Sequence, residues 1–262
     1  MKEFMSMAAD RPAGLIGTWV KIPALLTIEA LGHAGFDYVV IDMEHAPHGL
    51  DQAYGFIVAA QAAGMAALVR LPDHSGSTIQ RLLDAGADGL LVPRVTSVET
   101  AEQISRKMIF SPAGERGLGA TSRAGRWGLA DVADYLRRGD EQCLRMVQLE
   151  DWRSVGSADE FLAVESVNGV FVGLGDLGLS TGKRASDPEV QRLVRAVADS
   201  AKRCGKLSGI AAGTPEEASA YLELGYSLVM VSNDATMFAK AAAETLAATR
   251  SGSRPTASSP RP

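Results

Sequence analysis

The sequence contains little cysteine and no long hydrophobic run. Its two cysteines, Cys143 and Cys204, are not in C-x-x-C spacing, which argues against a disulfide scaffold or a zinc site. The longest apolar runs, such as 38–41 and 228–231, have the length of strands and fall far short of the ~18 residues that span a bilayer. Residues 1–11 lack the apolar segment of a secretory signal. We therefore expect a cytoplasmic protein with free thiols and no membrane partner.

The sequence also lacks an excess of positive charge. It has 26 lysines and arginines against 31 aspartates and glutamates, a net charge of −5, and no basic block. A nucleic-acid partner is therefore not expected. Hydrophobic residues make up 46% and charged residues 22%, values typical of globular proteins and not of disordered or fibrous ones.

One local pattern recurs along the chain. A helix-like segment ends in glycine, and a short, continuously apolar run follows, as in residues 34–41, 85–92 and 224–231. Glycine readily adopts the left-handed conformation that ends a helix. A run with no polar alternation indicates a strand buried on both faces, as in a parallel sheet.

Eight strands alternate with helices, which predicts a single-domain (β/α)8 barrel over residues 1–250. A doubly wound open sheet is the alternative, but residues 20–23 lack the glycines of a nucleotide-binding loop. Residues 251–262 are rich in serine and proline and predict a disordered tail. The predicted strands are Ile16–Val20, Tyr38–Asp42, Ala66–Arg70, Gly89–Val92, Arg145–Glu150, Gly169–Gly173, Leu207–Ala211 and Leu228–Ser232. The predicted helices include Leu25–Ala34, Asp51–Ala63, Thr78–Asp84, Val98–Lys107, Pro188–Cys204 and Pro215–Leu224. The long connection Met108–Cys143 is expected at the strand-end face, where such loops are usually functional.

Acidic residues follow two neighbouring predicted strands. Glu150 and Asp176 would meet at the carboxyl ends of the strands, where two oxygen ligands suit Mg²⁺ or a similar divalent cation. The alternative is a pair of helix N-caps. The run Gly173–Asp176 contains small residues whose backbone N–H groups could hold an anion, and the alternative for it is a plain turn.

Histidine and arginine follow two other strands. His45 would lie over the site as a general base, or else as a loop histidine satisfied by a neighbouring carboxylate. Arg70 would bind a carboxylate or an oxyanion, or else form an ion pair with Asp42 or Glu44. A Schiff-base mechanism is disfavoured because Lys21 and Lys206 are the only lysines near the barrel, and Lys206 lies at the wrong end of its strand.

Seven motifs occur in order over residues 14–248 and resemble the HpcH/HpaI family of class II, metal-dependent pyruvate aldolases. They are 41–47 (IDMEHAP), 68–70 (LVR), 82–86 (LLDAG), 91–93 (LVP), 112–117 (PAGERG), 147–150 (VQLE) and 173–177 (GLGDL). The resemblance implies a barrel that reversibly cleaves a 4-hydroxy-2-oxo acid. The products would be an aldehyde and pyruvate, or a pyruvate analogue such as hydroxypyruvate.

The resemblance also implies site residues. A divalent cation (Mg²⁺, Mn²⁺ or Co²⁺) would be held by Glu150 and Asp176. Pyruvate would be held by Gln148 and the Gly175–Asp176 backbone, Arg70 would stabilise developing negative charge, and His45 would be the base. Asp84 would reach His45 from a neighbouring subunit, which implies a homo-oligomer, typically a hexamer, and Arg123 would help to close the site.

The sequence departs from the family at one motif. Residues 173–178 read Gly-Leu-Gly-Asp-Leu-Gly, where the family often has Gly-Pro-Ala-Asp-Leu-Ser. The metal ligand is kept, whereas the rigid proline and one hydroxyl are lost. Two other functions fit the same barrel: a citrate lyase β-like or malyl-CoA-type lyase, and a barrel without catalytic activity.

Overall fold

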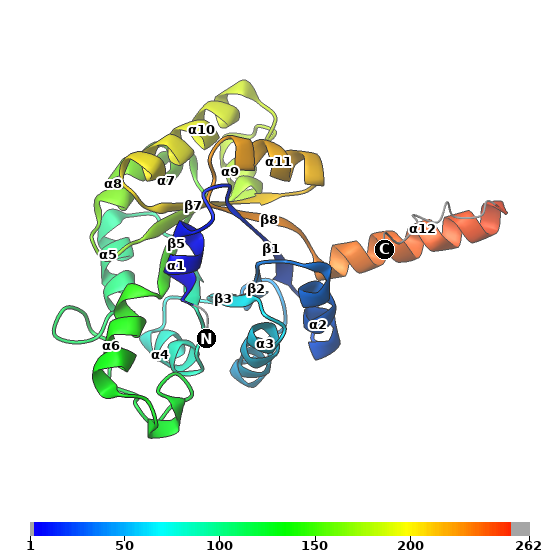
Figure 1. Ribbon diagram of the computed structural model, residues 1–262. Helices are drawn as coiled ribbons and strands as arrows, with labels where there is room; N and C mark the ends of the chain where they lie inside the picture. The colour runs from blue at the N-terminus through cyan, green and yellow to red at the C-terminus, as the bar shows by residue number, and fades with distance from the viewer. Residues whose placement is uncertain (1–2, 253–262) are drawn as a thin grey trace.

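Eight parallel strands close into a barrel in sequence order, β1 to β8, in the computed structural model, which describes residues 3–252 (Figure 1). The predicted (β/α)8 barrel is confirmed, and every strand lies within one residue of its predicted bounds. The strands are β1 Leu15–Val20, β2 Tyr38–Asp42, β3 Ala66–Arg70, β4 Gly89–Val92, β5 Leu144–Leu149, β6 Gly169–Val172, β7 Leu207–Ala212 and β8 Leu228–Asn233.

Helices cover the outside of the barrel (Figure 1). The six predicted helices are found within two residues of their expected bounds, and several shorter ones and a long last helix were not expected. The helices are α1 Phe4–Ala9, α2 Leu25–Ala34, α3 Leu50–Ala62, α4 Gly76–Asp84, α5 Val98–Arg106, α6 Val132–Glu141, α7 Trp152–Gly156, α8 Ala158–Ala163, α9 Leu174–Thr181, α10 Pro188–Arg203, α11 Pro215–Glu223 and α12 Asp234–Ser251, with a 3-10 turn at Arg126–Gly128.

The amino end of the barrel is closed by side chains. Phe4 of α1 is fully buried and packs edge-on against Tyr38, at the start of β2. Gly17 makes room for this ring, because a Cβ there would lie 2.4 Å from Tyr38. The barrel interior above is filled by large residues, including Met146 and Phe171. A functional site therefore has space only at the other end, where the strands finish.

Strand register brings charged residues together at that carboxyl end. β2 and β3 pair along their whole length, so that Asp42 lies beside Arg70. Continuous apolar runs elsewhere in these strands are buried on both faces, as expected of a parallel sheet. The two polar residues therefore come at the point where burial by the surrounding helices ends.

The long connection Met108–Cys143 is at the opposite end from the one expected. It follows α5, which has already returned the chain to the amino end of the barrel, so an insertion after this helix must lie there. It contains α6 and the 3-10 turn. The prediction that this segment lies at the strand-end face of the barrel is therefore wrong: it lies at the amino end.

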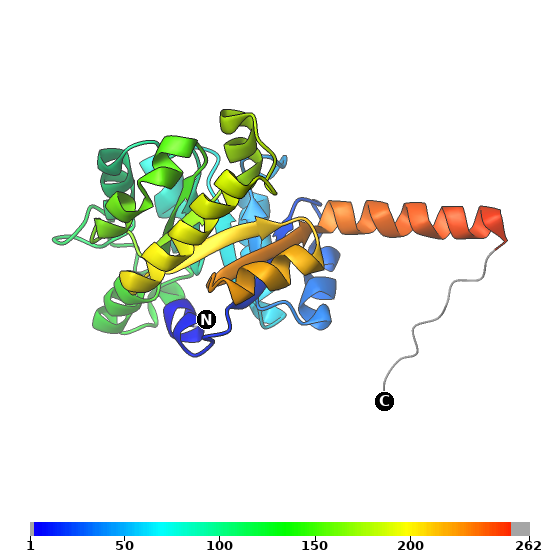
Figure 2. The ribbon, with the colours of Figure 1, turned by 90° about the horizontal axis from the view of Figure 1, so that it is seen from above.

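The last helix, α12, extends away from the barrel (Figures 1 and 2). Of its 18 residues only Asp234 is buried, while Phe238 is 70% exposed and Leu246 50%. The predicted tail begins inside this helix, at Ser251, and residues 253–262 lie outside those that the structure describes. Within residues 3–252, no helix combines the length and the apolar character needed to cross a membrane.

Candidate active site

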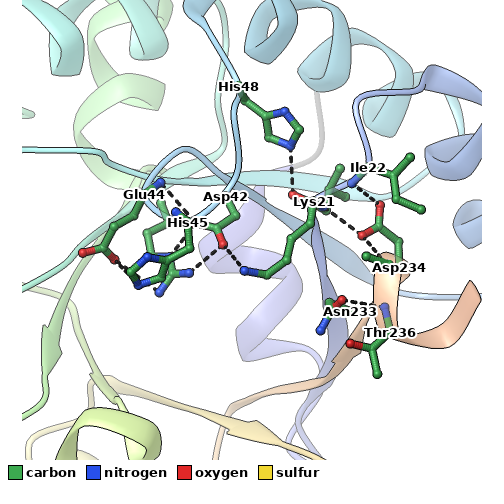
Figure 3. A network of polar contacts seen from close by, with 12 residues as sticks. Lys21, Ile22, Asp42, Glu44, His45, His48, Asn233, Asp234 and Thr236 are labelled. Atoms are coloured by element: carbon green, nitrogen blue, oxygen red, sulfur yellow. Dashed lines mark hydrogen bonds and ion pairs between the residues drawn. The ribbon is translucent and has the colours of Figure 1, made fainter. Parts of the chain in front are cut away.

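A fully buried carboxylate, Asp42, lies on the β1–β3 side of the barrel mouth (Figure 3). Arg70 donates to both of its oxygens, with Nε–Oδ1 at 2.9 Å and Nη2–Oδ2 at 2.6 Å. Lys21 Nζ lies 2.7 Å from the same Oδ2. Burial alone would raise the pKa of Asp42, but hydrogen bonds from Arg70 and Lys21 and the charge of Arg70 hold it well below the usual range. These contacts therefore stabilise the charged form of Asp42.

The Arg70 guanidinium is held from three directions. It stacks over the Trp19 ring at 4.2 Å and contacts Asp42, and its Nη1 lies 3.3 Å from Glu44 Oε2. Arg94 Nε approaches the other Glu44 oxygen at 3.2 Å. The alternative interpretation of Arg70, an ion pair with Asp42 or Glu44, is therefore confirmed for both carboxylates. These contacts also fix the orientation of the guanidinium at the mouth.

His45 lies in the same loop with its side chain largely free. The ring is 57% exposed, and its Nε2 is 3.6 Å from Glu44 Oε2. The backbone below it is fixed, because the N–H groups of Glu44 and His45 both donate to Asp42 Oδ1 at 3.1 Å. The histidine therefore has a neighbouring carboxylate, as the alternative required, and an accessible ring, as a base requires (Figure 3).

The loop after β1 is anchored by a residue from the far end of the sequence. Asp234 accepts hydrogen bonds from the backbone N–H groups of Lys21 at 2.8 Å and Ile22 at 3.0 Å (Figure 3). Closure of the barrel between β8 and β1 makes this contact possible. It sets the backbone position from which Lys21 reaches Asp42.

A second carboxylate group lies on the β5–β6 side. Glu150 directly follows β5, Asp176 lies in the first turn of α9, and both line a cleft with Arg94. Burial raises the pKa of Glu150, and the charges of Glu44 and Asp176 raise it further, against the Arg94 backbone N–H, which donates to Glu150 Oε1 at 3.2 Å. The more distant charge of Arg70 lowers this pKa, but within residues 3–252 no cationic side chain forms an ion pair with Glu150. A plain N-cap role is wrong for Glu150, because Asp151 accepts the N–H groups at the start of α7.

The donor set beside Glu150 fits a divalent cation that prefers oxygen ligands. Gln148 is buried, and its Oε1 has no hydrogen-bond partner within the described part of the chain. Gly173 leaves room for these groups, since a Cβ there would lie 2.8 Å from Glu150 Cγ. Residues 3–252 contain no group of three or more acidic, histidine or cysteine side chains placed to hold a metal. A cation here would thus rely on Glu150 and Asp176, with water and substrate completing its shell.

The segment after β6 begins a helix. Gly173 precedes α9, and its carbonyl accepts the first helical hydrogen bond from Leu177 N–H at 2.9 Å. The N–H groups of Leu174, Gly175 and Asp176 have no acceptor within the helix. The expectation of backbone donors is therefore met by a helix start beside Asp176, which favours an anionic ligand.

Asp84 and Arg123 lie at the other end of the barrel. Asp84 ends α4, and its Oδ1 is 3.2 Å from Arg116 Nη2. Arg123 donates to the Ala85 carbonyl at 2.9 Å and to Gln61 Oε1 at 2.7 Å. The structure thus brings His45, Arg70, Gln148, Glu150 and Asp176 to one mouth and leaves these two apart. Arg123 therefore cannot close the site of its own subunit, contrary to the expectation.

Known proteins resemble this chain in sequence and in fold. The pattern of the HpcH/HpaI aldolase/citrate lyase family matches residues 15–241. The chain belongs to this family. It is 36% identical over 228 residues to a 5-keto-4-deoxy-D-glucarate aldolase of Escherichia coli O139:H28 (strain E24377A / ETEC), covering 86% of this chain and 88% of the relative.

Solved structures of HpcH/HpaI proteins agree with the family assignment. One from Burkholderia cenocepacia J2315 superposes with a TM-score of 0.85 at 32% identity, covering 94% of this chain and 99% of the other. An HpcH/HpaI aldolase from Desulfitobacterium hafniense DCB-2 gives a TM-score of 0.88 at 26% identity, with 94% and 96% covered. The predicted family is therefore confirmed.

Sequence reasoning missed two parts of this HpcH/HpaI site. Lys21 was considered only as a Schiff-base candidate, although it contacts Asp42. Arg94 was assigned no role, yet it joins Glu44 to Glu150 from a left-handed backbone conformation with φ 55°. Such a conformation is uncommon for a non-glycine residue and is typical of functional sites, but the sequence carries no local signal for it.

Proposed function

We propose that this protein is a divalent-metal-dependent, carbon–carbon-cleaving aldolase. It would reversibly cleave a 4-hydroxy-2-oxo acid to an aldehyde and pyruvate, or a pyruvate analogue such as hydroxypyruvate. The observation that carries this proposal is the contrast between Glu150, which forms no ion pair within residues 3–252, and Arg70, which is fixed on the facing side of the mouth. Mg²⁺, Mn²⁺ or Co²⁺ suits the oxygen donors.

The residues on the β5–β6 side would bind the 2-oxo acid. Glu150 and Asp176 would hold the cation, which when bound polarises the keto group and stabilises the enolate charge. The free N–H groups of Gly175 and Asp176 would bind the substrate carboxylate. Arg70 would face the oxygen on which negative charge develops, and its contacts with Trp19 and Asp42 would hold it in place without reorganisation.

His45 would handle the proton on the acceptor side. In the cleavage direction its exposed ring would accept the proton of the 4-hydroxyl group as the C3–C4 bond breaks. In the addition direction it would return a proton to the aldehyde oxygen. Glu44, 3.6 Å from Nε2, would orient the ring and stabilise its protonated form.

The E. coli relative is named for 5-keto-4-deoxy-D-glucarate, a deoxy-keto sugar acid with two carboxylates. We infer a substrate of this class. It supplies a 4-hydroxy-2-oxo acid for the β5–β6 side and a second charged group for the mouth. The altered motif at 173–178 keeps Asp176, so it affects the turn and not the cation site.

An assay of pyruvate release tests this function. It should be run with free and CoA-linked substrates, with and without EDTA, and after borohydride treatment in the presence of pyruvate. Activity on the free acid that EDTA abolishes and borohydride spares would support the proposal. Full activity after exhaustive chelation, or covalent trapping of pyruvate, would refute metal dependence. Activity confined to CoA-linked substrates would indicate the alternative lyase.

We also propose a homo-oligomer, a hexamer, that completes the site. Asp84 can meet a His45 only if another subunit supplies one of them. Its surroundings suit an interface, because the loop beside it exposes large apolar residues: Leu118, Trp127, Leu129 and Val132. Helix α12, of which only Asp234 is buried, is a second surface that association would cover.

Light scattering tests the oligomeric state, and mixing inactive variants tests whether two subunits share one site. Asp84→Ala and Glu150→Ala chains, each inactive alone, should regain activity when refolded or exchanged together, because some mixed sites contain both intact residues. Mixing Glu150→Ala with Asp176→Ala is the matched control and should restore nothing, since both ligands come from one chain. A fully active monomer would refute the proposal.

A further inference from the structure

The β1–β3 side of the mouth contains a cation that the function above does not use. Lys21 directly follows β1, and 27% of its side chain is exposed. Its Nζ lies 2.7 Å from Asp42 Oδ2, and within residues 3–252 this is the one ion pair that the side chain forms. An ammonium group has three donors, so two remain for a ligand.

Two cationic side chains on this side of the mouth converge on one carboxylate oxygen. Lys21 and Arg70 both contact the same oxygen of Asp42, so two cations lie next to each other on one carboxylate. Glu44 is the other carboxylate here and is already shared by Arg70 and Arg94. Two cations thus share one buried carboxylate oxygen, and the arrangement favours a ligand atom that carries or develops negative charge.

The position of Lys21 in the barrel indicates which atom that is. Strand order places β1 and β2 across the barrel from β5 and β6, so Lys21 and His45 lie opposite Glu150 and Asp176. A 2-oxo acid held by Glu150 and Asp176 would present its reacting carbon toward β1 and β2. The acceptor oxygen would then come between Lys21 and His45.

We propose that Lys21 is a catalytic residue that donates a hydrogen bond from its ammonium group to the acceptor oxygen. This proposal rests on the aldolase function proposed above. In the addition direction, the enolate carbon forms a bond to the aldehyde carbon and the carbonyl electron pair moves onto the aldehyde oxygen. His45 supplies the proton to that oxygen. Lys21 keeps its own proton and stabilises the negative charge that grows on the oxygen. Cleavage runs the same steps backward.

The same contacts argue against an imine at Lys21. An imine requires a neutral amine, but this ammonium is one of two cations that compensate the fully buried Asp42 carboxylate. Losing its charge would leave Asp42 with Arg70 alone. Lys21 therefore acts as a charged hydrogen-bond donor and not as a nucleophile.

Separating two partial reactions tests the role of Lys21. Proton exchange at the pyruvate methyl group needs enolate formation but no acceptor, whereas aldol cleavage needs both. Lys21→Met should lower kcat for cleavage on the order of 10²- to 10³-fold, the usual effect of losing one oxyanion donor, and leave exchange within a few-fold. Lys21→Arg, which keeps the charge, should recover part of the loss. Lys206→Met, a half-buried lysine at the other end of the barrel, is the matched control and should leave both reactions unchanged.

Three results would overturn the assignment. If Lys21→Met cleaves at the wild-type rate, the residue does not contact the reacting oxygen. If exchange, cleavage and melting temperature fall together, Lys21 only supports Asp42 and Arg70. If borohydride traps pyruvate on Lys21, the residue is a nucleophile. Wild-type protein that neither exchanges nor cleaves would instead refute the proposed aldolase function.

Discussion

Two carboxylates at the same barrel mouth have opposite surroundings. Asp42, on the β1–β3 side, is fully buried and receives hydrogen bonds from Arg70, Lys21 and two backbone N–H groups, which hold its pKa well below the usual range. Glu150, on the β5–β6 side, is half-buried, lies near Glu44 and Asp176, and has a raised pKa. Asp42 thus forms ion pairs with two cationic side chains, whereas Glu150 forms none within residues 3–252.

This difference agrees with a structural role for Asp42 and with the proposed ligand-binding role of Glu150. A buried charge is stable only when paired, and Asp42 is paired within its own chain. Within residues 3–252, Glu150 has no ion-pair partner. The buried amide oxygen of Gln148 beside it has no hydrogen-bond partner there either. Such an uncompensated group in a cleft is typical of a functional site. The proposed cation site at Glu150 requires this contrast between the two sides of the mouth.

The largest effect should follow removal of the under-compensated pair. Glu150→Ala or Asp176→Ala should lower kcat for pyruvate release on the order of 10³-fold or more, because the term lost is several kcal/mol of enolate stabilisation. Asp151→Asn is the matched control, since Asp151 is the adjacent acid of the same cleft and both of its oxygens accept hydrogen bonds at the start of α7. Comparable losses in all three variants would contradict a special role for the pair.

Replacing His45 should have the next largest effect and should spare the cation site. His45→Ala should lower cleavage by roughly 10²- to 10⁴-fold, the usual contribution of a general base. Metal affinity, measured by calorimetry, should stay at the wild-type value because His45 lies on the β2 side. The melting temperature should change little, since the ring is 57% exposed. A folded variant that loses metal, or that cleaves at the wild-type rate, would show that the base is another group.

The fold was predictable because its signals are local. Short, largely apolar runs predicted every strand to within one residue, with the glycine pattern clearest at three of them, and the strand ends pointed to Glu150 and Asp176 as candidates. The helix at Leu174–Thr181 was missed because its two glycines disfavour a helix, and only packing of the buried Leu177 overrides them. The direction of α12 was missed for a related reason, since periodicity indicates a helix but not what it packs against.

The links between charges were not predictable, because they depend on barrel closure. Asp234 holds the Lys21 backbone across 213 positions of sequence, and no local pattern indicates that contact. Likewise, the Asp42–Arg70 pair depends on the exact register of β2 against β3. Sequence reasoning could give the ion pair only as one alternative for Arg70. The identity of the site residues was therefore easier to predict than their partners.

Removing the compensated carboxylate should mainly affect stability. Asp42→Asn leaves two cations without their shared partner, and breaking a buried ion pair costs about 3–5 kcal/mol of unfolding free energy. The lowered pKa of Asp42 means that its contribution is present above about pH 4 and is lost as the pH falls through the folded-state value. In urea unfolding, the wild type should therefore have a much larger free energy of unfolding than Asp42→Asn at pH 7. This difference should become smaller in acid. The exposed pair of Asp159 and Arg203 provides the control, and Asp159→Asn should change stability little at either pH.

The smallest effect, and the sharpest contrast with Asp42, should come from neutralising Glu150 without cation. Its pKa is raised above 4.5, so the wild-type protein loses stability as the pH rises through the interval above that value. Glu150→Gln removes the repelled charge. In EDTA at pH 7 the variant should equal or exceed the wild type in unfolding free energy, by no more than about 1 kcal/mol because the side chain is half-exposed to solvent.

Adding a divalent cation should reverse that order. A ligand at 100 times its Kd stabilises a protein by about 2.7 kcal/mol, so Mg²⁺ or Mn²⁺ should raise the melting temperature of the wild type and leave Glu150→Gln nearly unchanged. Asp151→Asn should respond like the wild type. If Glu150→Gln is clearly less stable in EDTA, Glu150 is a structural carboxylate like Asp42. If both proteins gain equally from the cation, the binding site lies elsewhere, and the contrast between the two sides of the mouth does not reflect function.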